Sequence, residues 1–183
     1  TDTSNGAAYE LRKGMVDYVT GMTGDFARLS SGLWVRKTSV STYTSKAQLK
    51  PSITSAVYTV GKKWDTLKLN YPSSLAAIAD FDGSKLTVRI SAAVSGVQPK
   101  LPANALFSSA TFKKYDNYGQ YTLTLKQGKK IEGYYIEKTA NGIILHVKRP
   151  VTISAGDKPL TGITIMLDPG HGGSDTGAIG PLG

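Results

Sequence analysis

Residues 78–90 read Ile-Ala-Asp-Phe-Asp-Gly-Ser-Lys-Leu-Thr-Val-Arg-Ile, two short segments on either side of Asp82-Gly83. Between Leu86 and Ile90 apolar and polar residues alternate, as they do in a strand that buries one face. An Asp-Gly pair between two such segments is a strong signal for a β-hairpin, because both turn residues tolerate a positive φ. These residues therefore predict an antiparallel hairpin.

The same arrangement occurs twice more along the chain. The flanking segments are Thr111–Lys114 and Tyr121–Leu125 around residues 116–119, and Tyr134–Lys138 and Ile143–Val147 around Asn141-Gly142. Upstream, Leu67, Leu69 and Tyr71 alternate with Lys68 and Asn70, which gives one buried and one solvated face. Short alternating strands between turn residues are typical of a β-sandwich or barrel, so the chain is predicted to be mainly β.

Turn residues and prolines set the predicted domain boundaries. Residues 1–8 are a polar linker, 9–50 a small β module with strands near Met15–Thr20 and Leu33–Tyr43, and 51–152 a β-sandwich. Residues 153–162 form a hinge with Gly156 and Pro159, and residues 163–183 begin a further domain. Ile163 to Leu167 alternates like a strand.

The composition excludes some classes of protein. The chain has no cysteine, so it can form neither a disulfide nor a cysteine-based zinc site. No apolar run approaches the roughly 20 residues that span a bilayer. The formal charge of +9 favours polyanionic surroundings, but the basic residues occur in scattered pairs and no nucleic-acid-binding motif is present. We therefore expect neither a nucleic-acid groove nor a membrane span.

The glycine-rich turn after Leu167 carries the residues most suggestive of chemistry. It reads Asp168-Pro-Gly-His-Gly-Gly-Ser-Asp-Thr-Gly-Ala178. A phosphate-binding loop would need a lysine after Gly177, and an esterase would need a Gly-x-Ser-x-Gly elbow. Asp175-Thr-Gly177 matches the triplet of aspartic proteases. Their chemistry requires two such carboxylates that share a proton, and this chain contains no second copy of the triplet. A histidine on such a loop is otherwise more often structural or solvent-facing than catalytic.

Taken as a whole, the string from Ile165 to Ala178 resembles the opening of the zinc-dependent N-acetylmuramoyl-L-alanine amidases. The resemblance covers about the last 20 residues of the chain. It implies that residues 163–183 begin an α/β catalytic domain and that His171 is a ligand of a catalytic Zn²⁺ in the intact parent protein. Such a metal activates water for attack on the amide between N-acetylmuramic acid and L-alanine in peptidoglycan.

The same resemblance implies that the remaining ligands and the catalytic glutamate follow Gly183. We therefore expect this chain alone to hold no zinc and to be inactive, with no catalytic residue of its own. His146, the other histidine, is expected to be a surface residue. Residues 163–167, without a sheet of their own, are expected to be disordered or to pair with another β edge, including that of another molecule.

Two weaker resemblances concern the upstream residues. Glu10–Val16 followed by Ser31–Lys37 is similar to part of a bacterial SH3-like module, and residues 55–150 resemble the AMIN-type β domains that precede amidase domains. Such domains are linked to binding peptidoglycan. Trp34 is then a candidate stacking platform for a ligand, although an ordinary core role is the more common one. Tyr121 and Lys148 are candidates to contact glycan or anionic wall polymers, or else form the solvated side of a sandwich.

The sequence therefore predicts a secreted, non-catalytic region that binds or positions a peptidoglycan hydrolase at the bacterial cell wall. The alternative is a purely structural or binding β protein of the cell envelope without hydrolase activity. Continuation of the sequence past Gly183 into a zinc-binding glutamate would distinguish the two hypotheses.

Overall fold

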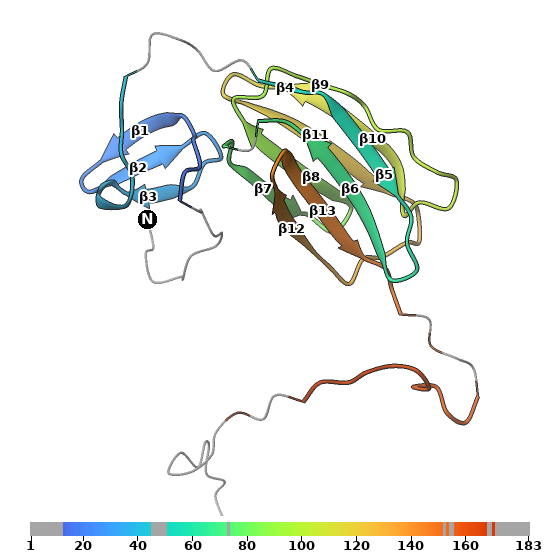
Figure 1. Ribbon diagram of the computed structural model, residues 1–183. Helices are drawn as coiled ribbons and strands as arrows, with labels where there is room; N and C mark the ends of the chain where they lie inside the picture. The colour runs from blue at the N-terminus through green and yellow to red at the C-terminus, as the bar shows by residue number, and fades with distance from the viewer. Residues whose placement is uncertain are drawn as a thin grey trace, which may run out of the picture. The chain divides into compact units, whose positions relative to one another are not determined.

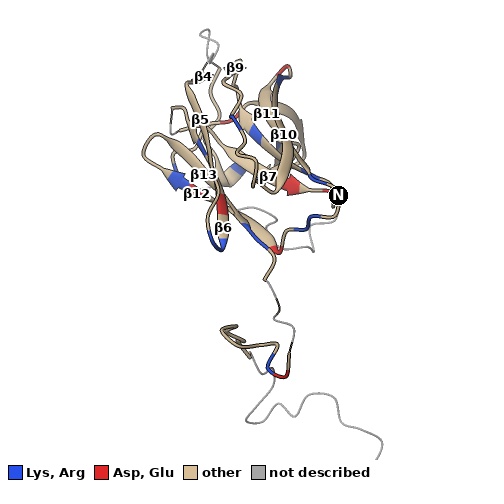
Figure 2. Cartoon of the chain, turned by 90° about the vertical axis from the view of Figure 1, so that its right-hand side faces the viewer, with Lys and Arg blue, Asp and Glu red and all other residues tan. Residues whose placement is uncertain are grey.

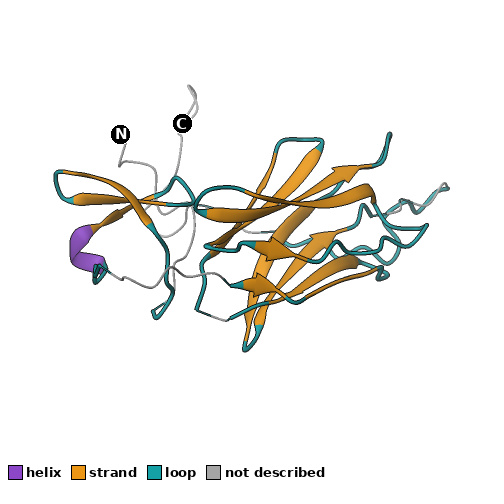
Figure 3. Ribbon diagram, turned by 90° about the horizontal axis from the view of Figure 1, so that it is seen from above, coloured by secondary structure: helices purple, strands orange, loops and turns teal. Residues whose placement is uncertain are grey.

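Strands dominate the structure, which is a computed structural model and describes residues 13–44, 51–72, 74–151, 153, 156–167 and 170. The chain divides into two compact units, Thr1–Pro150 and Val151–Gly183. In the described residues the helical structure consists of one 3₁₀ turn, Lys37–Ser39 (Figure 3). The predicted mainly β class is confirmed.

All described strands belong to the first unit (Figure 1). They are β1 (Val19–Thr23), β2 (Phe26–Leu29), β3 (Trp34–Arg36), β4 (Ser52–Ile53), β5 (Ser55–Thr59), β6 (Trp64–Asn70), β7 (Ala77–Phe81), β8 (Lys85–Ser91), β9 (Ser95–Gly96), β10 (Phe107–Lys114), β11 (Tyr118–Leu125), β12 (Gly133–Thr139) and β13 (Gly142–Lys148).

Two four-stranded antiparallel sheets form the sandwich. We call them the β6 sheet, with strand order β12-β13-β6-β5, and the β8 sheet, with order β10-β11-β8-β7. Each is assembled from two hairpins joined through their second strands, β6 to β13 and β8 to β11. The predicted hairpins are β7-β8, β10-β11 and β12-β13, and all three are present. A short parallel pair, β4 with β9, lies beside them.

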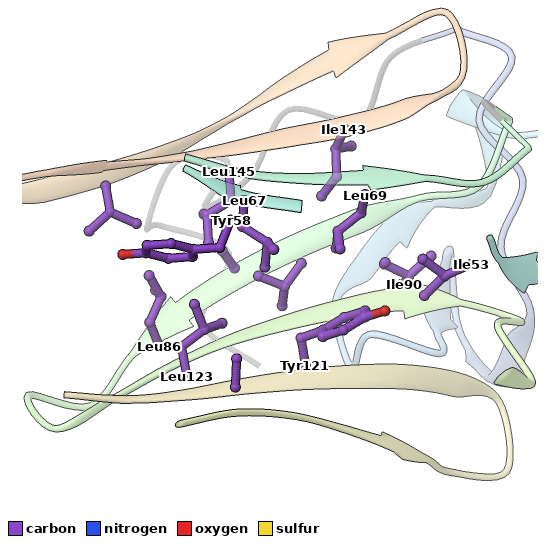
Figure 4. Packing of buried hydrophobic residues seen from close by; sticks show 14 of the residues in the cluster. Ile53, Tyr58, Leu67, Leu69, Leu86, Ile90, Tyr121, Leu123, Ile143 and Leu145 are labelled. Carbon is purple, nitrogen blue, oxygen red and sulfur yellow. The ribbon is translucent and has the colours of Figure 1, made fainter. Parts of the chain in front are cut away.

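The core lies between these two sheets (Figure 4). Residues that alternate along each strand point inward, which places Leu67 and Leu145 of one sheet against Leu86 and Leu123 of the other. These four side chains are fully buried. Burial of apolar surface at about 25 cal/mol per Å² makes this interface the main source of stability.

The N-terminal β module differs from the sequence prediction. Its sheet has the order β1-β2-β3, and β2 was not predicted. β1 starts later than expected, at Val19, and runs through Gly21, where the register shifts between Val19 and Gly21. A glycine inside a strand often marks such an irregularity, so reading Gly21 as a strand end was wrong.

Hydrogen bonds connect this module to the sandwich within the first unit. Asp17 Oδ1 accepts hydrogen bonds from the hydroxyls of Ser30 and Ser91, and Arg89 donates to the carbonyl oxygen of Ser31. Val16 also forms an isolated parallel bridge with Leu75. Asp17 thus ties the segment before β1 to the end of β8.

In the second unit, residues 158–163 form two turns in which Thr161 N donates to Lys158 O and Ile163 N to Leu160 O. The predicted strand Ile163–Leu167 lies in no strand pair among the described residues. Met166 is 89% exposed and Leu167 is 85% exposed. An alternating segment without a neighbouring strand has no ladder to join, so the pattern alone does not make it a strand.

We predict that Gly142→Ala destabilises the sandwich by about 3 kcal/mol or more. Gly142 has φ +135°, and a Cβ there would lie 2.0 Å from the carbonyl oxygen of Leu69 on the adjacent strand. The free energy of unfolding from urea denaturation measures the effect. Gly21→Ala is the control, since its Cβ meets only Arg28 Cβ at 3.9 Å, and an equal loss in both variants would contradict this account.

Candidate ligand-binding face

The outer face of the β6 sheet carries the side chains that alternate with the core. In β6, Asp65, Leu67 and Leu69 are buried, so Trp64 and Lys68 lie on the opposite face. The strand register then places Tyr135, His146 and Thr66 in one row across the sheet, and Lys148 opposite Trp64. This row brings together residues that are far apart in the sequence.

Three rings gather on this face, and we call Trp64, Tyr135 and His146 the aromatic cluster. The rings of Tyr135 and His146 are stacked, with centroids 4.5 Å apart and planes at 5°. Trp64 meets Tyr135 edge-on at 5.4 Å and His146 at 6.4 Å. Tyr135 remains 49% exposed. Each ring is therefore held by the other two, and part of the cluster faces solvent.

Charged groups border the aromatic cluster. His146 Nε2 lies 2.8 Å from Glu137 Oε2, and Lys148 Nζ lies 3.6 Å from Glu132 Oε2. Exposed pairs of this kind contribute little to stability, about 0–1 kcal/mol. Their effect is to fix the orientation of the imidazole and to place carboxylate and ammonium groups beside exposed rings.

A flat ring flanked by hydrogen-bonding groups suits a ligand that is apolar on one face and polar at its edge. Aromatic side chains supply large contact area at a low cost in conformational entropy. The edge groups supply acceptors at Glu137 and donors at Lys148. Sugar rings have this combination of C–H faces and peripheral hydroxyls.

A buried carboxylate, that of Asp65, lies on the other side of the same strand. Asp65 is fully buried and accepts hydrogen bonds from Tyr58 Oη at 2.6 Å and Arg149 Nη1 at 2.6 Å. Its remaining partners are the backbone N–H groups of Gly61 and Leu106. Burial and then the hydrogen bond to the Asp65 carboxylate raise the pKa of Tyr58 well above its usual range, so this hydroxyl stays a donor.

This arrangement is a structural clamp. Arg149 directly follows β13, and its other head-group nitrogen donates to the carbonyl oxygen of Asn104. Asp65 therefore fixes the point at which the chain leaves the sandwich, close to the boundary of the first unit at Pro150. All atoms of the carboxylate are occupied by partners inside the protein.

The residues predicted to contact ligand are separated by the fold. Trp34 lies in β3 of the N-terminal sheet and is 39% exposed, so the expectation that it is a core residue was wrong. Lys148 lies on the outer face of the β6 sheet next to Trp64. Of the predicted ligand contacts, only Lys148 belongs to the aromatic face.

Tyr121 does not lie on an exposed strand face. It is fully buried, its ring packs 5.1 Å from that of Phe112, and its hydroxyl donates to Val97 O at 2.8 Å. β11 buries Gly119, Tyr121 and Leu123 together, which fixes their common inward direction. The prediction that Tyr121 contacts glycan was therefore wrong.

The predicted zinc ligand His171 lies outside the described residues. Within the part of the chain that the structure describes, no three histidine or carboxylate side chains lie close enough together to hold a metal ion. His146 meets a single carboxylate, Glu137, across the strands, a partner that linear spacing did not indicate.

Basic residues of the first unit are spread over several strands and turns, as Figure 2 shows. No helix in the described chain is long and apolar enough to cross a membrane.

Trp64 and Tyr135 were not among the ligand contacts predicted from the sequence. The alternation of residues does indicate their positions, because Trp64 lies on the same face of its strand as Lys68, and Tyr135 on the same face as Glu137. What the alternation lacked was the register between strands. That register follows from a two-residue loop of Ala140 and Asn141, with Thr139 opposite Gly142.

Comparison of the chain with models of protein families, with curated proteins and with solved structures gave no match. The resemblance of the terminal string to the amidases therefore stays a prediction.

We predict that Asp65→Asn lowers the free energy of unfolding by about 2–4 kcal/mol. The substitution leaves Arg149 without its charged partner and weakens the acceptor of the Tyr58 hydroxyl. Urea denaturation measures the loss. Asp80→Asn, on the exposed side of β7, is the matched control and should change stability by less than about 0.5 kcal/mol. Equal effects would show that the clamp contributes nothing.

Alkaline pH should destabilise the sandwich through Tyr121. Burial raises the pKa of Tyr121 to about 12, against 10.0 for an unperturbed tyrosine. Because the folded-state value is the higher one, this contribution to stability is complete below pH 10 and is lost as the pH rises towards 12. Tyr121→Phe should flatten that loss in thermal denaturation measured between these pH values, and an unchanged pH profile would contradict the assignment.

Proposed function

We propose that the β-sandwich binds the glycan of the bacterial cell wall through the outer face of the β6 sheet. The observation that carries the proposal is the aromatic cluster, in which three rings are held together on a partly exposed sheet face. In a monomeric domain, an exposed aromatic surface bordered by polar groups is a common sign of a binding site. The proposal concerns binding and includes no catalytic step.

Sugar rings suit this face better than a flat apolar ligand does. A pyranose ring stacks its C–H groups on the exposed part of Tyr135, while its hydroxyls reach the carboxylate of Glu137. Lys148 beside Trp64 adds a donor, and in peptidoglycan the peptide carboxylates offer it an acceptor. The ligand class is therefore a polysaccharide that carries some negative charge.

The net charge of +9 is a second, less specific contribution. Dispersed lysine and arginine residues attract anionic wall polymers such as teichoic acid, and salt screens this attraction with a Debye length of about 10 Å at 0.1 M. Stacking on neutral rings is not screened in this way. The salt dependence of binding thus separates the two contributions.

We further propose that the sandwich positions a peptidoglycan hydrolase at a secreted or wall location. The support for this part is the sequence string from Ile165 to Ala178, which resembles the start of the zinc-dependent amidases. In the structure, the clamp at Asp65 fixes the exit of the chain from the sandwich at Arg149, 16 residues before Ile165. A binding face on a rigid domain followed by a linker is a suitable arrangement for such positioning.

We predict that Tyr135→Ala reduces retention of the chain on purified peptidoglycan by about 10-fold, because it removes the exposed stacking surface. The measurement is a pull-down across a salt series, on peptidoglycan with and without teichoic acid. Wild-type binding to bare peptidoglycan should persist at high salt, whereas any additional binding to teichoic acid should disappear.

Two matched controls are available in the N-terminal part of the chain. Tyr43→Ala removes an exposed tyrosine and Trp34→Ala an exposed tryptophan, and neither should weaken binding. If these variants lose retention while Tyr135→Ala does not, the N-terminal module is the binding region and the proposal is wrong. Retention that vanishes completely with salt would also overturn it, because only the net charge would then be acting.

A further inference from the structure

A second feature of the β6 sheet lies at the other end of strand β6 from Trp64. Asn70, at that end, is six residues from Trp64, which corresponds to ~20 Å at ~3.3 Å per residue. There the structure has an open hollow of about 390 Å³, lined by Ser52, Thr54, Asn70, Tyr71, Pro72 and Asn141. We call it the polar hollow. Its volume is in the range of small-molecule sites, roughly 300–1,000 Å³.

The lining of the polar hollow is neutral and rich in hydrogen-bonding groups. Two hydroxyls and two carboxamides come from Ser52, Thr54, Asn70 and Asn141, and no lining residue carries a charge. Burial raises the pKa of the Tyr71 phenol well above its usual range, so this side chain is also neutral. The neutral lining of the polar hollow therefore provides no electrostatic attraction for a charged ligand.

Two of the lining residues carry polar atoms that lack partners. In the described chain, Asn70 Oδ1 and the Tyr71 hydroxyl are buried and make no hydrogen bond. A buried polar atom without a partner costs about 1–3 kcal/mol, so a native structure usually supplies one. Both atoms are sealed from solvent, so a donor in the open hollow reaches Asn70 Oδ1 only when the carboxamide rotates.

The backbone around the hollow is fixed. Tyr71 N donates to Asn141 O at 2.9 Å, and Thr54 N donates to Asn70 O at 2.9 Å. These bonds join the end of β6 to the turn between β12 and β13 and to the residue before β5. The lining residues are thus held in place before any ligand arrives, which lowers the entropic cost of binding.

We infer that the polar hollow is a second subsite of the glycan-binding face and takes the acetamido group of an N-acetylated amino sugar. An acetamido group has one N–H donor and one carbonyl acceptor, which the carboxamides and hydroxyls of the lining complement, and it carries no charge. The inference rests on the proposed function, since one glycan chain lying along β6 would contact both the aromatic cluster and the hollow. It adds a requirement for the N-acetyl substituent.

The test compares two β-1,4-linked tetrasaccharides, one of N-acetylglucosamine and one of glucose, binding to the ¹⁵N-labelled 183-residue chain by NMR titration. The N-acetylated probe should bind the more tightly and should shift the side-chain amide signals of Asn70 and Asn141. Asn70→Ala should weaken the N-acetylated probe by about 3- to 10-fold and leave the glucose probe unchanged. Thr54→Val, which keeps the shape of the lining, should act in the same direction.

Thr111→Ala, on the exposed side of β10, is the control for both variants, and thermal denaturation confirms that each is folded. Equal affinity of the two probes, or an Asn70→Ala variant that binds like the control, overturns the inference. The proposed function survives that result if Tyr135→Ala still loses retention on peptidoglycan. If wild-type retention itself is absent or purely salt-dependent, the proposed function fails, whatever NMR shifts the tetrasaccharides cause at Asn70.

Discussion

The alternation of side chains across two facing sheets is the constraint on which this structure depends. Every second residue of β6, β8, β11 and β13 is needed to fill the space between the sheets, which leaves the intervening residues to solvent. Whether a side chain belongs to the core or to the surface therefore depends first on its position in the alternation and on the strand register, and only then on its residue type. Tyr121 and Tyr135 illustrate this, because the first is part of the core and the second is part of an exposed aromatic cluster.

Buried polar groups add specificity to an otherwise apolar core. Asp65 occupies an inward position of β6, where a charge without partners would cost several kcal/mol. Tyr58, Arg149 and two backbone N–H groups satisfy it, and each comes from a different part of the chain. An apolar residue at this position would fill the space equally well but would not specify where the chain leaves β13. The clamp therefore fixes where the chain leaves β13, and removing one of its partners is costly because the other charge is left buried.

The sequence predicted the strands and hairpins of the sandwich, but it did not predict which residues of neighbouring strands lie opposite each other. Asp-Gly, Asn-Gly and alternating segments located three hairpins, because turn residues act locally. The turn residues alone did not determine the loop lengths. Asp82 accepts hydrogen bonds from the backbone N–H groups of Ser84 and Lys85, which lower the pKa of its carboxyl group and stabilise a longer turn with Phe81 opposite Leu86. Likewise, a loop centred on Asn141-Gly142 would place Tyr135 opposite Lys148, whereas the observed loop places it opposite His146.

This difference in register explains why the site escaped prediction. The aromatic cluster requires Trp64, Tyr135 and His146 to share one end of one face, and a shift of two residues between β12 and β13 separates the two stacked rings. The polar hollow depends on the same turn, since Asn141 reaches the end of β6 only when Gly142 lies opposite Asn70. Gly142 makes that approach possible because any side chain would meet the carbonyl oxygen of Leu69. Both ends of the proposed glycan-binding face are thus set by one short loop, so a change in this loop should affect stacking and acetamido recognition together.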